Sequence, residues 1–194
     1  MALPRAGAPT PVREDLGAIW RSAATVVTLQ SVSPAPPTDN EVPLLVDLSH
    51  KLGAALGPST CATLSLRARS GLLLYDGALA QAHGGAVVKL VELDPLQGRA
   101  LIVGAHTSAD VRLPWLVHRA IPEALVLLWG AVPRPADVAT LASPSIGALT
   151  SLEEMAQAVP QIRSTGVLIA GDKSLLWART PQALLHRLGI GTGD

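Results

Sequence analysis

The chain of 194 residues has a single cysteine and no excess of either charge. One cysteine, Cys61, excludes an intrachain disulfide and any zinc site built from several thiolates. Lysine plus arginine number 15 and aspartate plus glutamate also number 15, so the formal net charge is zero. Because no basic cluster is longer than Arg67-Ala68-Arg69, we do not expect nucleic-acid binding. A neutral surface favours association, so we expect protein partners, as a homo-oligomer or a subunit of a larger assembly.

Long apolar runs are also missing. The longest, Ala124–Val132, has about half of the ~18 residues that a membrane helix requires, and it ends at Pro133. Nucleotide-binding loops of the GxGxxG or Walker type do not occur. Glu14 and Asp15 interrupt the arginines near the N-terminus, which does not favour a cleaved targeting segment. We therefore expect a cytoplasmic protein without a membrane span, with an organelle matrix as the alternative location.

The chain is nevertheless apolar. Hydrophobic residues make up 48% of it and charged residues 15%, and a chain of this size buries about 70% of its surface, which suffices for one core. The proline-rich segment Ser31–Asn40 predicts a linker. Residues 1–40 are therefore interpreted as an N-terminal arm, with a short helix within Asp15–Gln30, and residues 41–194 as a single domain.

Hydrophobic spacing in that domain predicts alternating helices and short strands. Helical spacing covers residues 44–56, 113–120, 151–159 and 180–188. Strand character covers residues 62–68, 71–75, 86–93, 100–103, 125–128, 166–170 and 175–178. The consecutive strands from 62 to 103 predict an antiparallel meander. The fold class is therefore α/β or α+β, with a mixed sheet covered by helices.

This order of elements, together with two short motifs, resembles the class II aldolase/adducin superfamily. The motifs are Arg119-Ala120-Ile121-Pro122-Glu123-Ala124 at a helix end and Gly166-Val167-Leu168-Ile169-Ala170-Gly171. The resemblance covers about residues 43 to 190 and implies a class II aldolase-like central sheet. Enzymes of that family bind a zinc-like metal with three histidines, use a glutamate as acid and base, and hold a sugar phosphate on loop residues.

Matched residue by residue, the family's three histidine positions fall on Trp129, Ala131 and Thr165. An indole offers only a donor and cannot ligate a cation. The resemblance therefore implies a domain that has lost the metal site, and we expect neither a metal nor another cofactor. We predict structural roles for Trp129, which would fill the pocket with apolar volume, and for Trp115.

The family's catalytic glutamate falls on Asp110, whose carboxylate is one methylene shorter, so Asp110 is the candidate catalytic residue. His106 and His118 flank it in the sequence, and the three side chains could form a displaced metal site. Ser108 is more simply explained as the N-cap of the helix that follows.

Thr63, Ser65 and Ser108 match phosphate-loop positions of the family and are candidate ligands for a small anion. The sequence favours a non-catalytic domain that acts as a structural, assembly or regulatory subunit, as the head of adducin keeps this fold without the metal site. One alternative is a sugar-phosphate lyase, an aldehyde-lyase, with a rearranged site at Asp110 and a neighbouring histidine. Another is a metal-free module that binds a small anion or phosphosugar.

Overall fold

The computed structural model describes residues 27–57, 62–77, 87–105, 107, 110–132, 152–170 and 173–191. Their strands are β1 (Thr28–Ser33), β2 (Ala62–Ala68), β3 (Gly71–Asp76), β4 (Val87–Asp94), β5 (Arg99–Val103), β6 (Val126–Gly130), β7 (Val167–Ala170) and β8 (Lys173–Ala178). Their helices are α2 (Val42–Leu56), α4 (Arg112–Ala120), α5 (Leu152–Thr165) and α6 (Pro181–Arg187).

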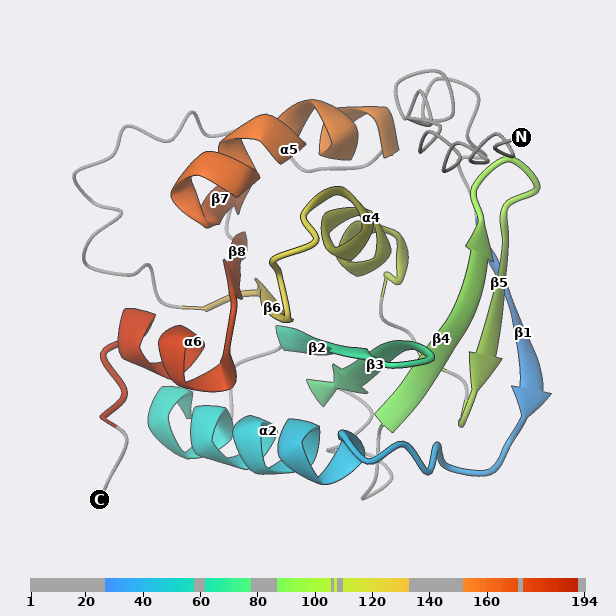
Figure 1. The fold of residues 1–194 in the computed structure, drawn as a ribbon, viewed down its shortest axis with the longest axis horizontal. Helices are drawn as coiled ribbons and strands as arrows, with labels where there is room; N and C mark the ends of the chain where they lie inside the picture. The colour runs from blue at the N-terminus through green and yellow to red at the C-terminus, as the bar shows by residue number, and fades with distance from the viewer. Residues whose placement is uncertain are drawn as a thin grey trace, which may run out of the picture.

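These strands form one sheet of eight, in the order β1-β5-β4-β3-β2-β6-β8-β7. Figure 1 shows α4 and α5 on one side of this sheet and α2 and α6 on the other. β1 pairs with β5 in parallel, whereas β2 to β5 run as the expected antiparallel meander. The predicted mixed α/β class is confirmed.

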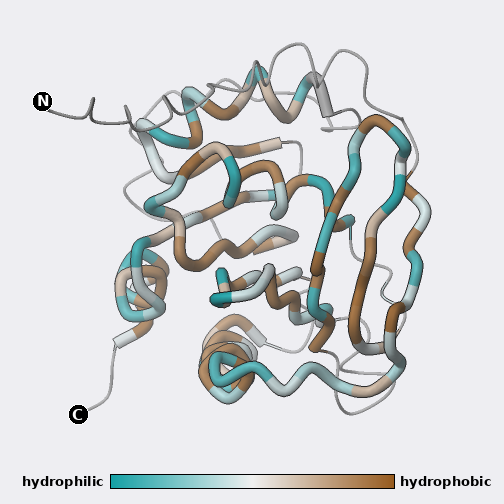
Figure 2. The backbone as a smooth tube through the Cα atoms, turned by 45° about the vertical axis from the view of Figure 1, so that its right-hand side comes forward, coloured by the Kyte–Doolittle hydropathy of each residue, from teal (hydrophilic) through white to brown (hydrophobic). Residues whose placement is uncertain are grey.

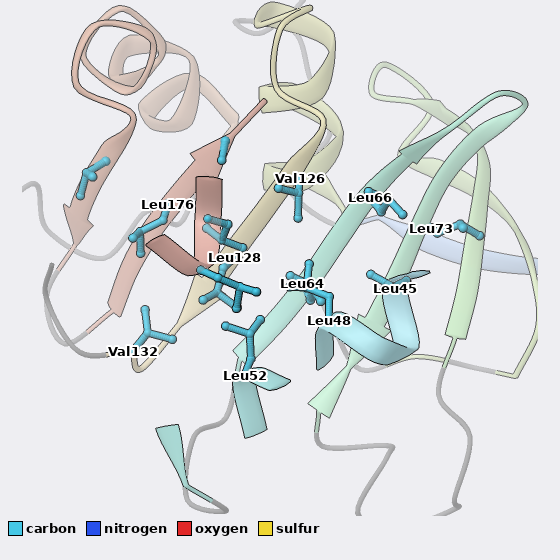
Figure 3. Close-up of a cluster of buried hydrophobic side chains, with 14 of the residues drawn as sticks. Leu45, Leu48, Leu52, Leu64, Leu66, Leu73, Val126, Leu128, Val132 and Leu176 are labelled. Carbon is cyan, nitrogen blue, oxygen red and sulfur yellow. The ribbon is translucent and has the colours of Figure 1, made fainter. Parts of the chain in front are cut away.

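α2 closes the core on one side of the sheet. Its buried residues Leu45, Leu48 and Leu52 recur at helical spacing and are each at most 5% exposed. Figure 3 shows them among strand residues from both halves of the sheet, including Leu64 and Leu128. This packing buries the apolar stripe that the sequence pattern predicted.

The opposite side of the sheet is equally apolar. Leu127 of β6 packs there with residues of α4 and α5, whereas its neighbours Val126 and Leu128 pack on the α2 side. Figure 2 shows hydrophobic residues along the strands that lie between the helices. β6 is therefore covered on both faces, which explains why its sequence does not alternate.

β1 corrects the interpretation of the N-terminal segment. The sequence predicted a linker over Ser31–Asn40 and helical spacing up to Gln30, but Thr28–Ser33 pairs with β5. Leu29 on this strand packs against the apolar cluster of β3, β4 and β5. The prolines that indicated a linker begin only at Pro34, after the strand has ended. Residues 1–26 lie outside the described part of the chain.

α5 corrects a helix boundary. The sequence predicted an end at Val159, yet the helix continues through Pro160 to Thr165. Proline inside a helix costs about 3 kcal/mol because it removes a hydrogen bond and crowds the preceding turn. Met155, Ala158 and Ile162 are each at most 1% exposed, on both sides of the proline, so burial outweighs that cost.

Among the described residues, no helix is both long and apolar enough to cross a membrane.

Candidate functional site

The candidate site lies at the end of the sheet, along the strand direction, that holds the carboxyl end of β6. The strand registers pair Asp76 of β3 with Thr63 of β2, Thr63 with Trp129 of β6, and Trp129 with Leu175 of β8. Partners in an antiparallel register point to the same face of a sheet. Trp129 and Leu175 pack into the α4 and α5 cluster, so this row faces those helices.

Trp129 is half-buried in that row. The Nζ atom of Lys173, at the start of β8, lies 5.9 Å from the centroid of its indole ring. An ammonium at this distance is attracted to the negative face of an indole. Apolar volume and a positive charge therefore occupy the end of β6.

Asp76, at one end of this row, forms a buried polar pair with Thr107. Asp76 is 4% exposed and Thr107 is 6% exposed. The hydroxyl of Thr107 donates to Oδ2 of Asp76 at 3.0 Å. The sequence analysis did not identify this pair: Asp76 reads as a turn residue after a strand, and the two are 31 positions apart.

Asp110, the candidate catalytic residue, lies just before α4 and is engaged by Arg112. Its Oδ1 accepts from the backbone N–H and from Nε of Arg112, at 3.0 and 2.9 Å, and its Oδ2 accepts from Nη2 at 2.7 Å. These charge-assisted bonds raise the pKa of the Arg112 guanidinium. The carboxylate thus closes the turn that begins α4, and Arg112 uses three of its about four acceptor positions.

Ser65 and His118 form a second buried pair, deeper below the same face. Nδ1 of His118 lies 3.0 Å from the carbonyl oxygen of Ala124, and Nε2 lies 3.0 Å from Oγ of Ser65. Because a carbonyl only accepts, we assign the ring proton to Nδ1, and the hydroxyl of Ser65 donates to Nε2. Burial lowers the pKa of His118 to about 4, with a smaller contribution from the nearby Arg67 charge.

Of the residues expected to hold an anion, Thr63 and Ser65 lie two positions apart on the same face of β2. Ser65 is 0% exposed and its hydroxyl serves His118, whereas Thr63 is half-buried beside Trp129. Ser108 and His106 lie outside the described part of the chain. Trp115 is half-buried on α4, packs against the clusters on that side of the sheet, and has the Arg119 guanidinium 5.6 Å from its ring centroid.

The geometry also corrects one position that the resemblance implied for a metal ligand. β6 and β7 both pair antiparallel with β8, so their carboxyl ends lie at the same end of the sheet along the strand direction. Ala131 directly follows Trp129 and Gly130 at that end. Thr165 precedes β7 and therefore lies toward the opposite end of the strands. The register places Trp129 level with Leu168, which puts Thr165 about 10 Å further along the strand direction. The three positions therefore do not converge on one point.

The chain supplies other residues at the carboxyl end of β6. Ala170, at the end of β7, pairs with Lys173, while Ser174 pairs with Gly130. Within the described ranges, no group of three or more histidine, cysteine, aspartate or glutamate side chains could hold a metal ion. The sequence feature that indicates this end of the sheet is the connection between β7 and β8, and the match to the family motif did not use it.

Comparison with solved structures gives the fold. The chain is similar to an L-fuculose 1-phosphate aldolase, with 14% identity and a TM-score of 0.55 over 79% of this chain and 81% of that chain. The chain has a class II aldolase-like fold. An L-fuculose-1-phosphate aldolase from Thermus thermophilus is 16% identical, with a TM-score of 0.46 over 77% of this chain and 86% of that one. No family model matches the chain, and no curated protein matches it in sequence.

The class II aldolase-like fold that the resemblance implied is thereby confirmed, although the motifs that suggested it are short. The fold leaves the activity open, because one fold carries many functions and the site decides among them.

Proposed function

We propose that this class II aldolase-like domain is non-catalytic and acts as an assembly or regulatory subunit through contacts with other protein chains. The observation that carries the proposal is Trp129, which stands where the resemblance implies a metal-binding histidine. Its indole packs against the cluster of α4 and α5, and the Lys173 ammonium lies over its ring. An indole cannot ligate a cation, and an ammonium nearby repels a divalent one.

The engagement of Asp110 supports the same proposal. A general base must hold a carboxylate oxygen within hydrogen-bond reach of the proton that it removes. Both carboxylate oxygens of Asp110 accept hydrogen bonds from Arg112, which stabilises the start of α4. Asp110 is therefore better suited to closing a turn than to acid and base work.

The test combines metal content with an assay of aldol cleavage. The purified full-length protein is dialysed, analysed for bound zinc, and incubated with L-fuculose 1-phosphate with and without added zinc, beside an L-fuculose 1-phosphate aldolase as positive control. We expect no zinc at one equivalent per chain and no cleavage. One zinc per chain that survives dialysis, or cleavage that depends on zinc, would contradict the proposal.

A sugar-phosphate lyase is the second candidate, and the fold neighbour named an L-fuculose 1-phosphate aldolase favours it. In that case Asp110, or the buried Asp76 beside Thr63, would carry the proton transfer. Asp110→Asn and Asp76→Asn would then abolish cleavage. A third candidate, a phosphosugar-binding module, is tested by a thermal-shift screen with phosphorylated sugars in which Thr63→Val serves as the comparison.

A further inference from the structure

A groove of about 630 Å³ lies between α2 and α6, on the face of the sheet opposite Trp129. Its walls are mainly apolar and small side chains, with one acid and one base near each other on α2. The lining residues are Leu44, Asp47, Leu48, Lys51, Ala54, Ala55, Pro181, Gln182, Leu185, Ile190 and Gly191.

The outer face of α2, which we define as Leu44, Asp47, Lys51, Ala54 and Ala55, forms one wall of this groove and is open to solvent. Leu44 is 39% exposed and is the largest apolar side chain of this face. The side chains of Asp47 and Lys51 are 58% and 56% exposed and form an ion pair of 2.8 Å along the helix. This face therefore offers one large apolar side chain, one charge of each sign and two alanines.

These features are self-complementary about the level of Ser49. Asp47 lies as far before Ser49 as Lys51 lies after it, and Leu44 lies as far before it as Ala54 lies after it. When two α2 helices pack antiparallel around a twofold axis at this level, each residue faces the one at the same distance on the other side of Ser49. Asp47 then faces the partner's Lys51, and Leu44 faces the partner's Ala54.

Size is complementary as well as charge. The alanines leave room at the carboxyl half of α2, where Leu185 and Ile190 form the other wall of the groove. A leucine from the amino half of a second α2 fits this space, since helices with small residues at their contact approach to about 8 Å. Twofold symmetry makes the same contact twice, so two leucines enter two grooves.

We propose that the chain forms a twofold dimer through the outer face of α2, with each Leu44 inserted into the groove between α2 and α6 of the other copy. The dimer places Asp47 of each protomer against the partner's Lys51. This inference goes beyond the proposed function and is independent of it, because the interface lies on the side of the sheet away from Trp129.

Charge reversal tests the pairing. Sedimentation velocity over a range of concentrations gives the dimer Kd of the full chain and of Asp47→Lys, Lys51→Glu and the double variant. Each single variant juxtaposes like charges at two symmetric positions and should raise Kd about tenfold, while the double variant should restore it. Glu92→Lys changes the net charge as Asp47→Lys does, at an exposed position on β4, and should leave Kd unchanged.

Stability separates these effects from misfolding. Dimerisation itself raises the melting temperature, so the melts are run well below the dimer Kd, where the chain is monomeric. An exposed ion pair along a helix contributes little to folding, so every variant should then keep the melting temperature of the wild type. Leu44→Arg removes the inserted side chain and should raise Kd by at least about tenfold, again without a change in melting temperature.

A chain that is monomeric at all concentrations would overturn the proposal, and would leave the groove to a different partner. So would a dimer that neither the charge reversals nor Leu44→Arg weakens, or single variants that the double variant does not rescue.

Discussion

At the scale of single residues, the sharpest consequence concerns His118, which the fold holds neutral. Its pKa falls from 6.5 to about 4 because it is buried between Ser65 and Ala124. Between these two pH values the unfolded chain binds a proton that the folded chain does not. The contribution of neutral His118 to the free energy of unfolding should therefore be complete above pH ~6.5. It should be lost as the pH drops to ~4, which lowers the free energy of unfolding by about 3 kcal/mol.

Urea unfolding at several pH values measures this change. His118→Gln removes the titrating group, so the variant should lose that part of the pH dependence even though its overall stability is lower. Parallel curves for the wild type and the variant between pH 4 and 6.5 would show that His118 binds its proton over the same pH range in the folded and the unfolded chain.

Trp129 gives a prediction on stability and function together. Removal of a fully buried indole costs about 3–5 kcal/mol. The structure shows it half-buried, so Trp129→Ala should cost about 2–3 kcal/mol, measured as the free energy of unfolding in urea. Trp129→Phe keeps most of the apolar volume and should cost less. An unchanged stability combined with lost binding of a phosphorylated sugar would instead assign the indole to a working pocket.

At the scale of elements, arginine side chains donate hydrogen bonds to backbone carbonyl groups at the ends of helices. The Nη2 atom of Arg67 on β2 donates to the carbonyl oxygens of His118 and Ile121, and its Nε donates to that of Ala124 at 3.3 Å. Arg187 does the same at the end of α5, where it donates to the carbonyl oxygens of Thr165 and Gly166. The carbonyls of His118 and Thr165 lie in the last turns of α4 and α5, where a helix supplies no donor of its own.

Arg67→Met should therefore destabilise the protein by about 1–3 kcal/mol, because the carbonyl oxygen of His118 loses this donor. The carbonyl oxygens of Ile121 and Ala124 keep a second donor each, the N–H of Ala124 and Nδ1 of His118. Arg67→Lys should recover little of this loss, since a single ammonium cannot reach the carbonyl groups that the planar guanidinium spans. Chemical denaturation of both variants provides the measurement. A lysine variant as stable as the wild type would show that charge alone, and not the fork geometry, matters here.

Helices and strands show best how much of the fold the sequence predicts. Spacing alone located the meander and α2, because each element buries one stripe or face. It failed at Pro160 and at Thr28–Ser33, where distant packing partners override a local signal. In the candidate site, the motif grouped Thr165 with Trp129 and Ala131, whereas strand register, which is set by pairing across the sheet, places Thr165 about 10 Å away along the strand direction. The buried contact of Asp76 had no local signal at all.

At the scale of the whole molecule, one sheet separates two surfaces. The face under α4 and α5 carries the row with Trp129, and the face under α2 and α6 carries the groove with Leu44. The same sheet also binds the N-terminal segment: β1 extends it beside β5, and Asp39 forms an ion pair of 2.8 Å with Lys89. Composition alone predicted that residues 1–40 form an N-terminal arm outside the domain of residues 41–194.

Deletion of residues 1–40 decides between these descriptions. It removes β1, uncovers one edge of β5 and breaks the ion pair of Asp39, whose pKa is lowered by its bond to Lys89. The deletion should lower the free energy of unfolding by about 2–4 kcal/mol, or the melting temperature by about 5–15 °C for a chain of this size. Asp39→Asn removes only the charge and keeps an amide oxygen for the donors Lys89 and Ser70, so it should account for about 1 kcal/mol of this loss. If the shortened chain melts within a degree or two of the full one, β1 contributes nothing to stability and the domain begins at α2.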